Sequence, residues 1–144
     1  MKRRVLILCT GNSCRSQMAE GLWRQLGGDE WDVFSAGVTP IGVDARAIKS
    51  MAEIGIDIRD QQSQAVSEFI DEPFDLIVTV CANADRQCPR FESAGSKVHW
   101  PFDDPYFAVG SEEDVRREFA RVREGIAQAI RSYLDGMPQS GAAS

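Results

Sequence analysis

The 144-residue sequence lacks a long hydrophobic run, and its apolar segments are far too short to cross a bilayer. It also lacks a basic excess, because 22 acidic side chains outnumber 16 basic ones and give a formal charge of −6. A nucleic-acid partner usually requires a basic face, so this balance argues against one. The basic start MKRR precedes only a short apolar run, so we expect no signal peptide, no membrane partner and a cytoplasmic protein.

Histidine occurs only once, and the four cysteines do not form the closely spaced pairs that structural zinc sites favour. These absences argue against zinc bound by Cys9, Cys14, Cys81 and Cys88, and we expect no metal or other cofactor. Cysteines in a cytoplasmic chain favour catalysis or redox chemistry over a structural disulfide framework. We interpret His99 as structural, because the loop discussed below already supplies stabilisation for a thiolate.

Apolar runs and amphipathic stretches alternate along the chain. This alternation predicts an α/β fold in three layers, a doubly wound four-stranded parallel sheet with helices on both faces. We expect a monomer with one catalytic domain over residues 1–136 and a disordered tail over 137–144. The predicted strands are 4–8, 31–37, 74–80 and 97–100, and the main predicted helices are 16–26, 45–54 and 112–133.

Two predicted strands are followed directly by a cysteine, Cys9 after the first and Cys81 after the third. In parallel α/β sheets, ligands bind beyond the carboxyl ends of the strands. Both thiols are therefore expected at the same edge of the sheet, where a ligand would bind.

The stretch CTGNSCRS, from Cys9 to Ser16, has the composition of an anion-binding loop. Gly11 allows successive N–H groups to point inward, and the helix that follows contributes its positive N-terminal end. Arg15 offers a planar fork for two oxygens of a tetrahedral oxyanion. A cysteine among such donors is favoured as the thiolate, its nucleophilic form, whereas Cys14 is expected to pack inward. The predicted oxyanion-binding residues are Thr10, Gly11, Asn12, Ser13, Cys14, Arg15 and Ser16.

The stretch CTGNSCRSQMAE (residues 9–20) resembles the phosphate-binding loop of low-molecular-weight protein tyrosine phosphatases, and more fully that of the thioredoxin-coupled arsenate reductases with the same fold. The phosphatases usually have proline where this chain has Gln17. The resemblance continues through SAG (35–37), TVCANADRQCP (79–89) and HWPFDDP (99–105). It covers nearly the whole chain and implies the low-molecular-weight phosphatase-like fold.

The resemblance also implies a reaction. The Cys9 thiolate would attack arsenate, Asp104 would act as general acid, and Cys81 and Cys88 would carry the resulting disulfide away for reduction by thioredoxin. From spacing alone, Asp103 is an equal alternative to Asp104. Glutaredoxin with glutathione, or another low-molecular-weight thiol, remains an alternative reductant. The short polar segment 82–87 is expected to rearrange during this relay.

Two other functions compete with arsenate reduction. One is a phosphatase with a phosphocysteine intermediate at Cys9, favoured by Tyr106 and Phe107 and disfavoured by Gln17 and the Cys81/Cys88 pair. The other is a phosphocarrier or an oxyanion-binding redox sensor without turnover, which would need neither an acid nor a resolving pair.

Some members of the family hold a monovalent cation near the loop, with side chains that match Asn12, Glu20 and Ser35. The fourth ligand position carries Gln64 instead of an aspartate, so a hard cation would bind less well. We therefore treat these residues as weak candidates.

Overall fold

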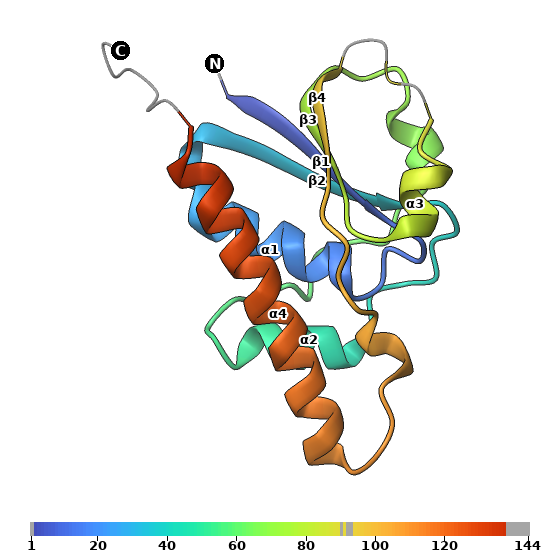
Figure 1. The fold of residues 1–144 in the computed structure, drawn as a ribbon, viewed down its shortest axis with the longest axis vertical. Helices are drawn as coiled ribbons and strands as arrows, with labels where there is room; N and C mark the ends of the chain where they lie inside the picture. Colours follow the sequence, from blue (N-terminus) through green and yellow to red (C-terminus); the bar gives the residue numbers. More distant parts are fainter. Residues whose placement is uncertain (1, 90, 92–93, 138–144) are drawn as a thin grey trace.

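Four parallel strands form one sheet in the order β2-β1-β3-β4 (Figure 1). The computed structural model describes residues 2–89, 91 and 94–137. The strands are β1 (Arg3–Cys9), β2 (Trp31–Gly37), β3 (Phe74–Thr79) and β4 (Ala94–His99). The predicted four-stranded parallel sheet is confirmed.

The register of the sheet brings the carboxyl ends of its strands to one edge. Cys9 at the end of β1 pairs with Gly37 at the end of β2, and Thr79 at the end of β3 pairs with His99 at the end of β4. β1 lies between two neighbours and is buried from Val5 onward, which explains its unbroken apolar sequence. The sheet therefore presents Cys9 at its ligand-binding edge.

Helices cover both faces of the sheet (Figure 1). On one face α1 (Arg15–Gly27) packs against α4 (Glu112–Asp135), with α2 (Ala45–Ala52) beside both. The Trp23 ring of α1 lies 5.1 Å from Trp31, 6.1 Å from Trp100 and 5.8 Å from Tyr133, measured between centroids. This aromatic cluster fixes the position of α1, and therefore also the position of its N-terminus, which follows the loop after Cys9.

The second face carries the 3₁₀ helix η2 (Val66–Phe69) and the five-residue helix α3 (Ala82–Arg86). Phe69 packs against Phe34 and Phe74, with centroids 5.8 and 6.2 Å apart. This layer is thinner than the first, because two short helices replace three longer ones. The remaining 3₁₀ helices are η1 (Gly28–Glu30) and η3 (Pro105–Phe107).

Several predicted boundaries shift in the structure. α2 ends at Ala52 and not near Ile54, because the chain turns there and reaches Gly55 with a φ of +79°. β4 begins three residues before the predicted start at 97. Ser111 caps α4 and forms the predicted capping box with Asp114.

α4 ends at Asp135, and the described chain continues to Met137, one residue past the predicted domain boundary at 136. Met137 is half-buried, and its sulfur lies 3.8 Å from a guanidinium nitrogen of Arg3. The other residues of the predicted disordered tail, 138–144, lie outside the described residues. Within the described ranges, no helix combines the length and apolar character needed to span a membrane.

Candidate active site

The loop from Cys9 to Arg15 connects the end of β1 to the start of α1. Its outer side is clamped by the segment that follows β2, whose N–H groups bond to successive loop carbonyls. The Gln17 side chain bonds to one further carbonyl, that of Asn12, at 3.0 Å. With these carbonyls engaged outside, the loop N–H groups are free to face inward, as an anion requires. The clamping bonds are Val38 to Cys9, Thr39 to Thr10, Ile41 to Gly11 and Asp44 to Ser13.

Gly37, at the end of β2, lets the loop lie close to the sheet. A Cβ atom at this position would lie 2.8 Å from the Thr10 carbonyl oxygen and 2.9 Å from the Asn12 nitrogen. Both are backbone atoms, so neither could move aside without displacing the loop. The glycine of the SAG motif is therefore needed because the backbone at the end of β2 lies close to the backbone of the loop.

The Cys9 sulfur receives two hydrogen bonds. The Asn12 N–H donates to it at 3.2 Å, and the Ser16 hydroxyl lies 2.8 Å away. Ser16 accepts a hydrogen bond from the Asn12 side-chain amide at 2.7 Å, so its own hydrogen is free for the sulfur. Asn12 makes these contacts from a left-handed conformation with φ of +48°. The sulfur also lies beside the N-terminus of α1, which favours negative charge.

Behind the loop, the weak cation candidates form one buried hydrogen-bond network. The Asn12 amide donates to the Ser35 hydroxyl at 3.0 Å, which donates to Glu20 at 2.6 Å. Arg24 pairs with the same carboxylate at 2.6 Å. Gln64 contributes its backbone N–H, which donates to the Asn12 side-chain oxygen at 2.8 Å. Burial raises the pKa of Glu20, and the bonds from Ser35 and Arg24 oppose this effect.

The positive charge beside Glu20 is thus supplied by Arg24. Among the residues that the structure describes, no three His, Cys, Asp or Glu side chains are grouped closely enough to hold a metal ion.

Arg15 and Asp104 lie together above the loop. A guanidinium nitrogen of Arg15 is 3.1 Å from the Asp104 carboxylate, and another donates to the Phe102 carbonyl at 3.0 Å. The other carboxylate oxygen of Asp104 accepts the Tyr106 N–H at 3.0 Å and caps η3. Two charged groups from positions 89 residues apart therefore meet at the mouth of the loop.

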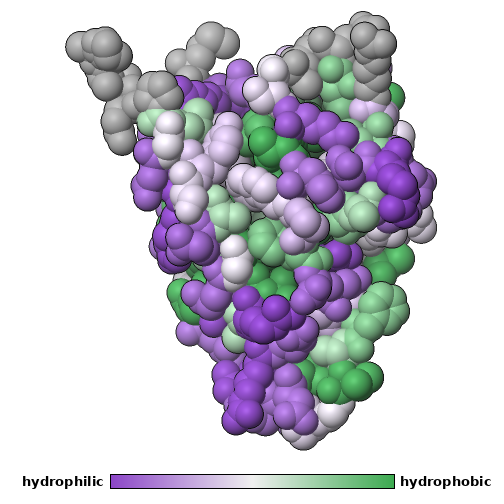
Figure 2. Space-filling model, in the orientation of Figure 1, coloured by the Kyte–Doolittle hydropathy of each residue, from purple (hydrophilic) through white to green (hydrophobic). Residues whose placement is uncertain are grey.

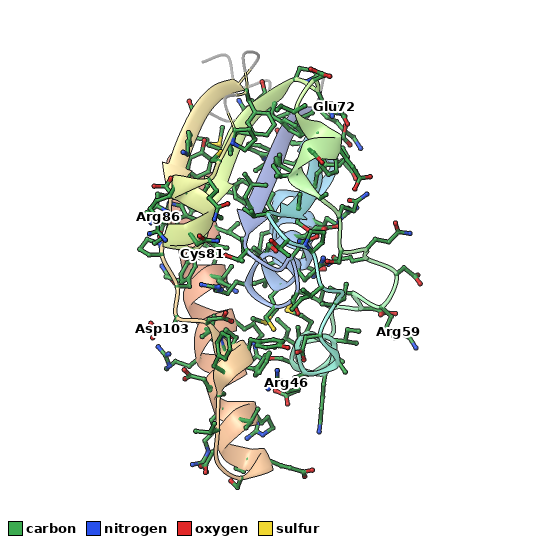
Figure 3. All side chains as sticks on the ribbon, turned by 90° about the vertical axis from the view of Figure 1, so that its right-hand side faces the viewer. Arg46, Arg59, Glu72, Cys81, Arg86 and Asp103 are labelled. Atoms are coloured by element: carbon green, nitrogen blue, oxygen red, sulfur yellow. The ribbon has the colours of Figure 1, made fainter. Side chains whose placement is uncertain are left out.

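The two candidate acids differ in their surroundings. The Asp103 side chain is 75% exposed, against 30% for Asp104, and it pairs with Arg121 on α4 at 2.8 Å. Figure 3 labels Asp103 at the outer edge of the molecule, beside α4. Asp104 lines the cavity above Cys9, so the geometry favours Asp104 over Asp103 as the candidate acid.

A cavity of about 410 Å³ opens above the Cys9 sulfur. Tyr106 and Phe107 form part of its rim; the two residues are 39% and 73% exposed, and their ring centroids are 5.1 Å apart. Figure 2 shows apolar surface at the lower right, where Figure 1 draws η3 and the loop after it. The cavity is lined by Cys9, Thr10, Gly11, Ser13, Cys14, Arg15, Thr39, Ile41, Asn83, Asp104, Tyr106 and Phe107.

Cys14 is buried, as the sequence predicts. Burial and the nearby Asp44 carboxylate raise the pKa of this thiol to about 12. Cys14 therefore remains a neutral thiol at physiological pH, unlike a nucleophilic cysteine.

Cys81 lies directly beside the loop. Its sulfur is 3.3 Å from the Thr10 hydroxyl and accepts the Ala84 N–H at 3.3 Å, which caps the start of α3. Figure 3 labels Cys81 next to this helix. The structure thus connects Cys9 and Cys81 through a single residue, Thr10.

Cys88 lies beyond the other end of α3 and is half-buried. Its thiol donates to the Pro89 carbonyl at 3.4 Å. Burial raises its pKa, and the Lys97 ammonium partly opposes this effect. All four cysteines are free, and α3 separates Cys81 from Cys88.

His99 helps to hold α3 in place through Thr79. Its Nδ1 atom lies 2.8 Å from the Thr79 hydroxyl, which donates to Asp85 on α3 at 3.1 Å. Lys97 pairs with the same carboxylate at 3.1 Å. This geometry fits the structural role expected of His99.

Some residues of the site carry no signal in the sequence. Thr39 and Ile41 line the cavity because the segment after β2 clamps the loop, which no motif predicts. Asn83 also lines it and donates to the Thr10 hydroxyl at 3.0 Å. Its place in the polar segment between two cysteines is the one feature that could have drawn attention to it.

The family described as low molecular weight phosphotyrosine protein phosphatase matches residues 4–142. An arsenate reductase from Halalkalibacterium halodurans is 46% identical over 134 residues, covering 93% of this chain and 96% of that protein. An arsenate reductase from Bacillus subtilis is 44% identical over 131 residues, covering 91% and 94%.

Among solved structures, an arsenate reductase in the phosphate binding state superposes with a TM-score of 0.80 at 28% identity, covering 94% of this chain and 99% of that one. The loop, the cysteine positions and these likenesses lead to one assignment. This chain belongs to the low molecular weight phosphotyrosine protein phosphatase family.

Proposed function

We propose that this protein reduces arsenate to arsenite by a relay of the three thiols Cys9, Cys81 and Cys88. The proposal rests mainly on the position of Cys81. Its sulfur lies 3.3 Å from the Thr10 hydroxyl, beside a loop that is suited to bind a tetrahedral oxyanion. A phosphatase needs no second thiol at this place. The arsenate reductases of H. halodurans and B. subtilis, similar over more than nine-tenths of the chain, support the same substrate.

Arsenate binds in the loop through inward-facing N–H groups, the N-terminus of α1 and Arg15. In the proposed reaction Arg15 exchanges its bond with Asp104 for two arsenate oxygens, which suit its planar fork. Asp104 is then free to act as a general acid.

In the first chemical step the Cys9 thiolate attacks arsenic and forms an As–S bond. One oxygen leaves as water after Asp104 has donated a proton to it. The Ser16 hydroxyl and the Asn12 N–H stabilise the thiolate before the attack.

In the second step the Cys81 thiolate attacks the Cys9 sulfur. The Cys9–Cys81 disulfide forms as the As–S bond breaks, and the electron pair of that bond stays on arsenic. Arsenic(V) becomes arsenic(III) while two thiols become one disulfide, so the electrons balance.

In the third step Cys88 attacks Cys81, releases the Cys9 thiolate and forms a Cys81–Cys88 disulfide. This step requires α3 to open, because that helix lies between the two cysteines. We propose that thioredoxin, a dithiol protein, reduces this disulfide in the cytoplasm, and that the reaction serves arsenic detoxification.

The first experiment mixes the reduced protein with arsenate, without external reductant, and maps disulfides by mass spectrometry. We expect one Cys81–Cys88 bond and one released arsenite per chain, and a Cys9–Cys81 bond in Cys88→Ser. Protein that keeps all thiols reduced would refute the relay. Regeneration by thioredoxin, compared with glutaredoxin plus glutathione, then identifies the reductant.

A second function, hydrolysis of aryl phosphates through a phosphocysteine at Cys9, is favoured by Tyr106 and Phe107 at the rim of the cavity. The test is hydrolysis of p-nitrophenyl phosphate by the wild type and by Cys88→Ser. Equal rates in both would show that this activity is independent of the relay.

A further inference from the structure

Asn83 connects α3 to the oxyanion loop. Its amide nitrogen donates to the Thr10 hydroxyl at 3.0 Å, and its amide oxygen accepts a hydrogen bond from Gln87 at 2.7 Å. The bond from Gln87 holds the amide oxygen away from Thr10 and so presents the nitrogen to the hydroxyl.

The hydrogen bonds of Thr10 then have a defined direction. A hydroxyl has one hydrogen to donate and can also accept. Because Thr10 accepts from Asn83, its own hydrogen is available to the Cys81 sulfur 3.3 Å away. The Ala84 N–H donates to that sulfur as well, so Cys81 faces two donors suited to a thiolate.

We propose that Asn83 is a positioning residue of the relay, which directs the Thr10 hydrogen towards the Cys81 sulfur and prepares Cys81 to attack Cys9. The inference rests on the proposed function, because it concerns the second step of that reaction. Asn83 acts through Thr10 and not by contact with the reacting sulfurs.

Asn83 could instead serve only to hold α3 in place, and the structure provides a way to separate the two roles. α3 has independent anchors at Asp85, which bonds to Thr79 and to Lys97. Alanine also has a higher helix propensity than asparagine, so Asn83→Ala does not in itself weaken the helix. A purely structural role would leave the ionisation of Cys81 unchanged.

The test follows the cysteine Cβ chemical shifts with pH in reduced, full-length protein labelled with [3-¹³C]cysteine. A charge-assisted hydrogen bond is worth about a tenfold change in an equilibrium. We therefore expect Asn83→Ala to lower the ratio of thiolate to thiol at Cys81 roughly tenfold at a given pH. Arg86→Ala, an exposed change on the same helix, should leave the Cys81 titration unchanged and serves as the matched control.

A double-mutant cycle tests whether the effect passes through Thr10. Thr10→Val should shift the Cys81 titration in the same direction, and adding Asn83→Ala should shift it no further. An unchanged titration in Asn83→Ala, or an equal shift with and without the Thr10 hydroxyl, would overturn the inference.

A kinetic measurement completes the test. In the Cys88→Ser background, Asn83→Ala should slow formation of the Cys9–Cys81 disulfide after addition of arsenate by roughly tenfold at neutral pH. The difference should vanish at a pH where Cys81 is fully ionised. The titration needs no arsenate, so it decides the role of Asn83 even if the wild type fails to reduce arsenate.

Discussion

The oxyanion loop and the helix α3 lie side by side but are stabilised very differently. The loop is clamped by backbone hydrogen bonds on its outer side and by buried Asn12 and Ser16 on its inner side. α3 has only five residues and is held mainly by side-chain bonds of Asn83 and Asp85. From this difference we expect the anion site to be the more rigid region, and the segment between Cys81 and Cys88 to open at lower cost.

The largest expected effect separates the chemistry of the two regions. Cys9→Ser should lower the rates of arsenate reduction and of aryl phosphate hydrolysis by at least about 10⁴-fold, because both reactions start from this thiolate. Cys88→Ser should remove only repeated reductase turnover. Steady-state assays of both activities check this, and a Cys9→Ser protein that still reduces arsenate would contradict the assigned nucleophile.

The next effect concerns the acid above the loop. Asp104→Asn keeps the shape but cannot donate the proton, so the first chemical step should slow by about 10²- to 10³-fold. Asp103→Asn is the matched control and should change the rate little, since Asp103 pairs with Arg121 at the surface. Rapid-quench measurement of a single turnover tests both. Equal losses in the two variants would argue against Asp104 as the acid.

Removing one hydroxyl group from each region compares their local stabilities directly, and the expected effect is smaller. Thr79→Val deletes the bond to Asp85, so amide exchange of residues 82–86 should accelerate by roughly tenfold. Ser63→Ala deletes a bond to the Gly11 carbonyl, but the clamp around the loop remains. Exchange in the loop should therefore stay unchanged. A loop that exchanges faster than α3 would reverse the comparison.

The smallest effect at neutral pH is that of Cys14. Its pKa in the folded protein is about 12, against an ordinary value of 9.0. Its contribution to stability is complete below pH 9 and is lost as the pH rises, because only the unfolded chain releases the proton there. When the pH is raised from 8 to 10.5, the unfolding free energy of the wild type should fall by about 2 kcal/mol more than that of Cys14→Ser. Urea denaturation at both pH values measures the difference.

Much of this site follows from the sequence, because its parts are local. The loop, the strand before it and the helix after it are contiguous, and Ser111 and Asp114 predict the start of α4 by their spacing alone. The resemblance already placed Asp104 at the loop, but no local pattern predicts the individual hydrogen bonds that join distant segments. Arg15 meets Asp104 across 89 positions and Asn83 meets Thr10 across 73, and only the folded sheet brings them together.

The shifted start of β4 has a different cause. The sequence SAGS is typical of a turn, yet Gly95 lies within the strand. A Cβ there would be 2.8 Å from the Asp75 carbonyl oxygen, so glycine permits β4 to lie close against β3. A local pattern cannot distinguish such a close approach from a turn.

Gly37 has a consequence for how this chain can change by mutation. Any larger residue there meets the backbone of the loop, while the strand that ends at Gly37 loses no side chain it needs. A single base change that replaces this glycine would therefore disable oxyanion binding and leave most of the sheet intact. A genetic selection for lost function should recover Gly37 substitutions alongside those of Cys9, although Gly37 takes no part in the chemistry.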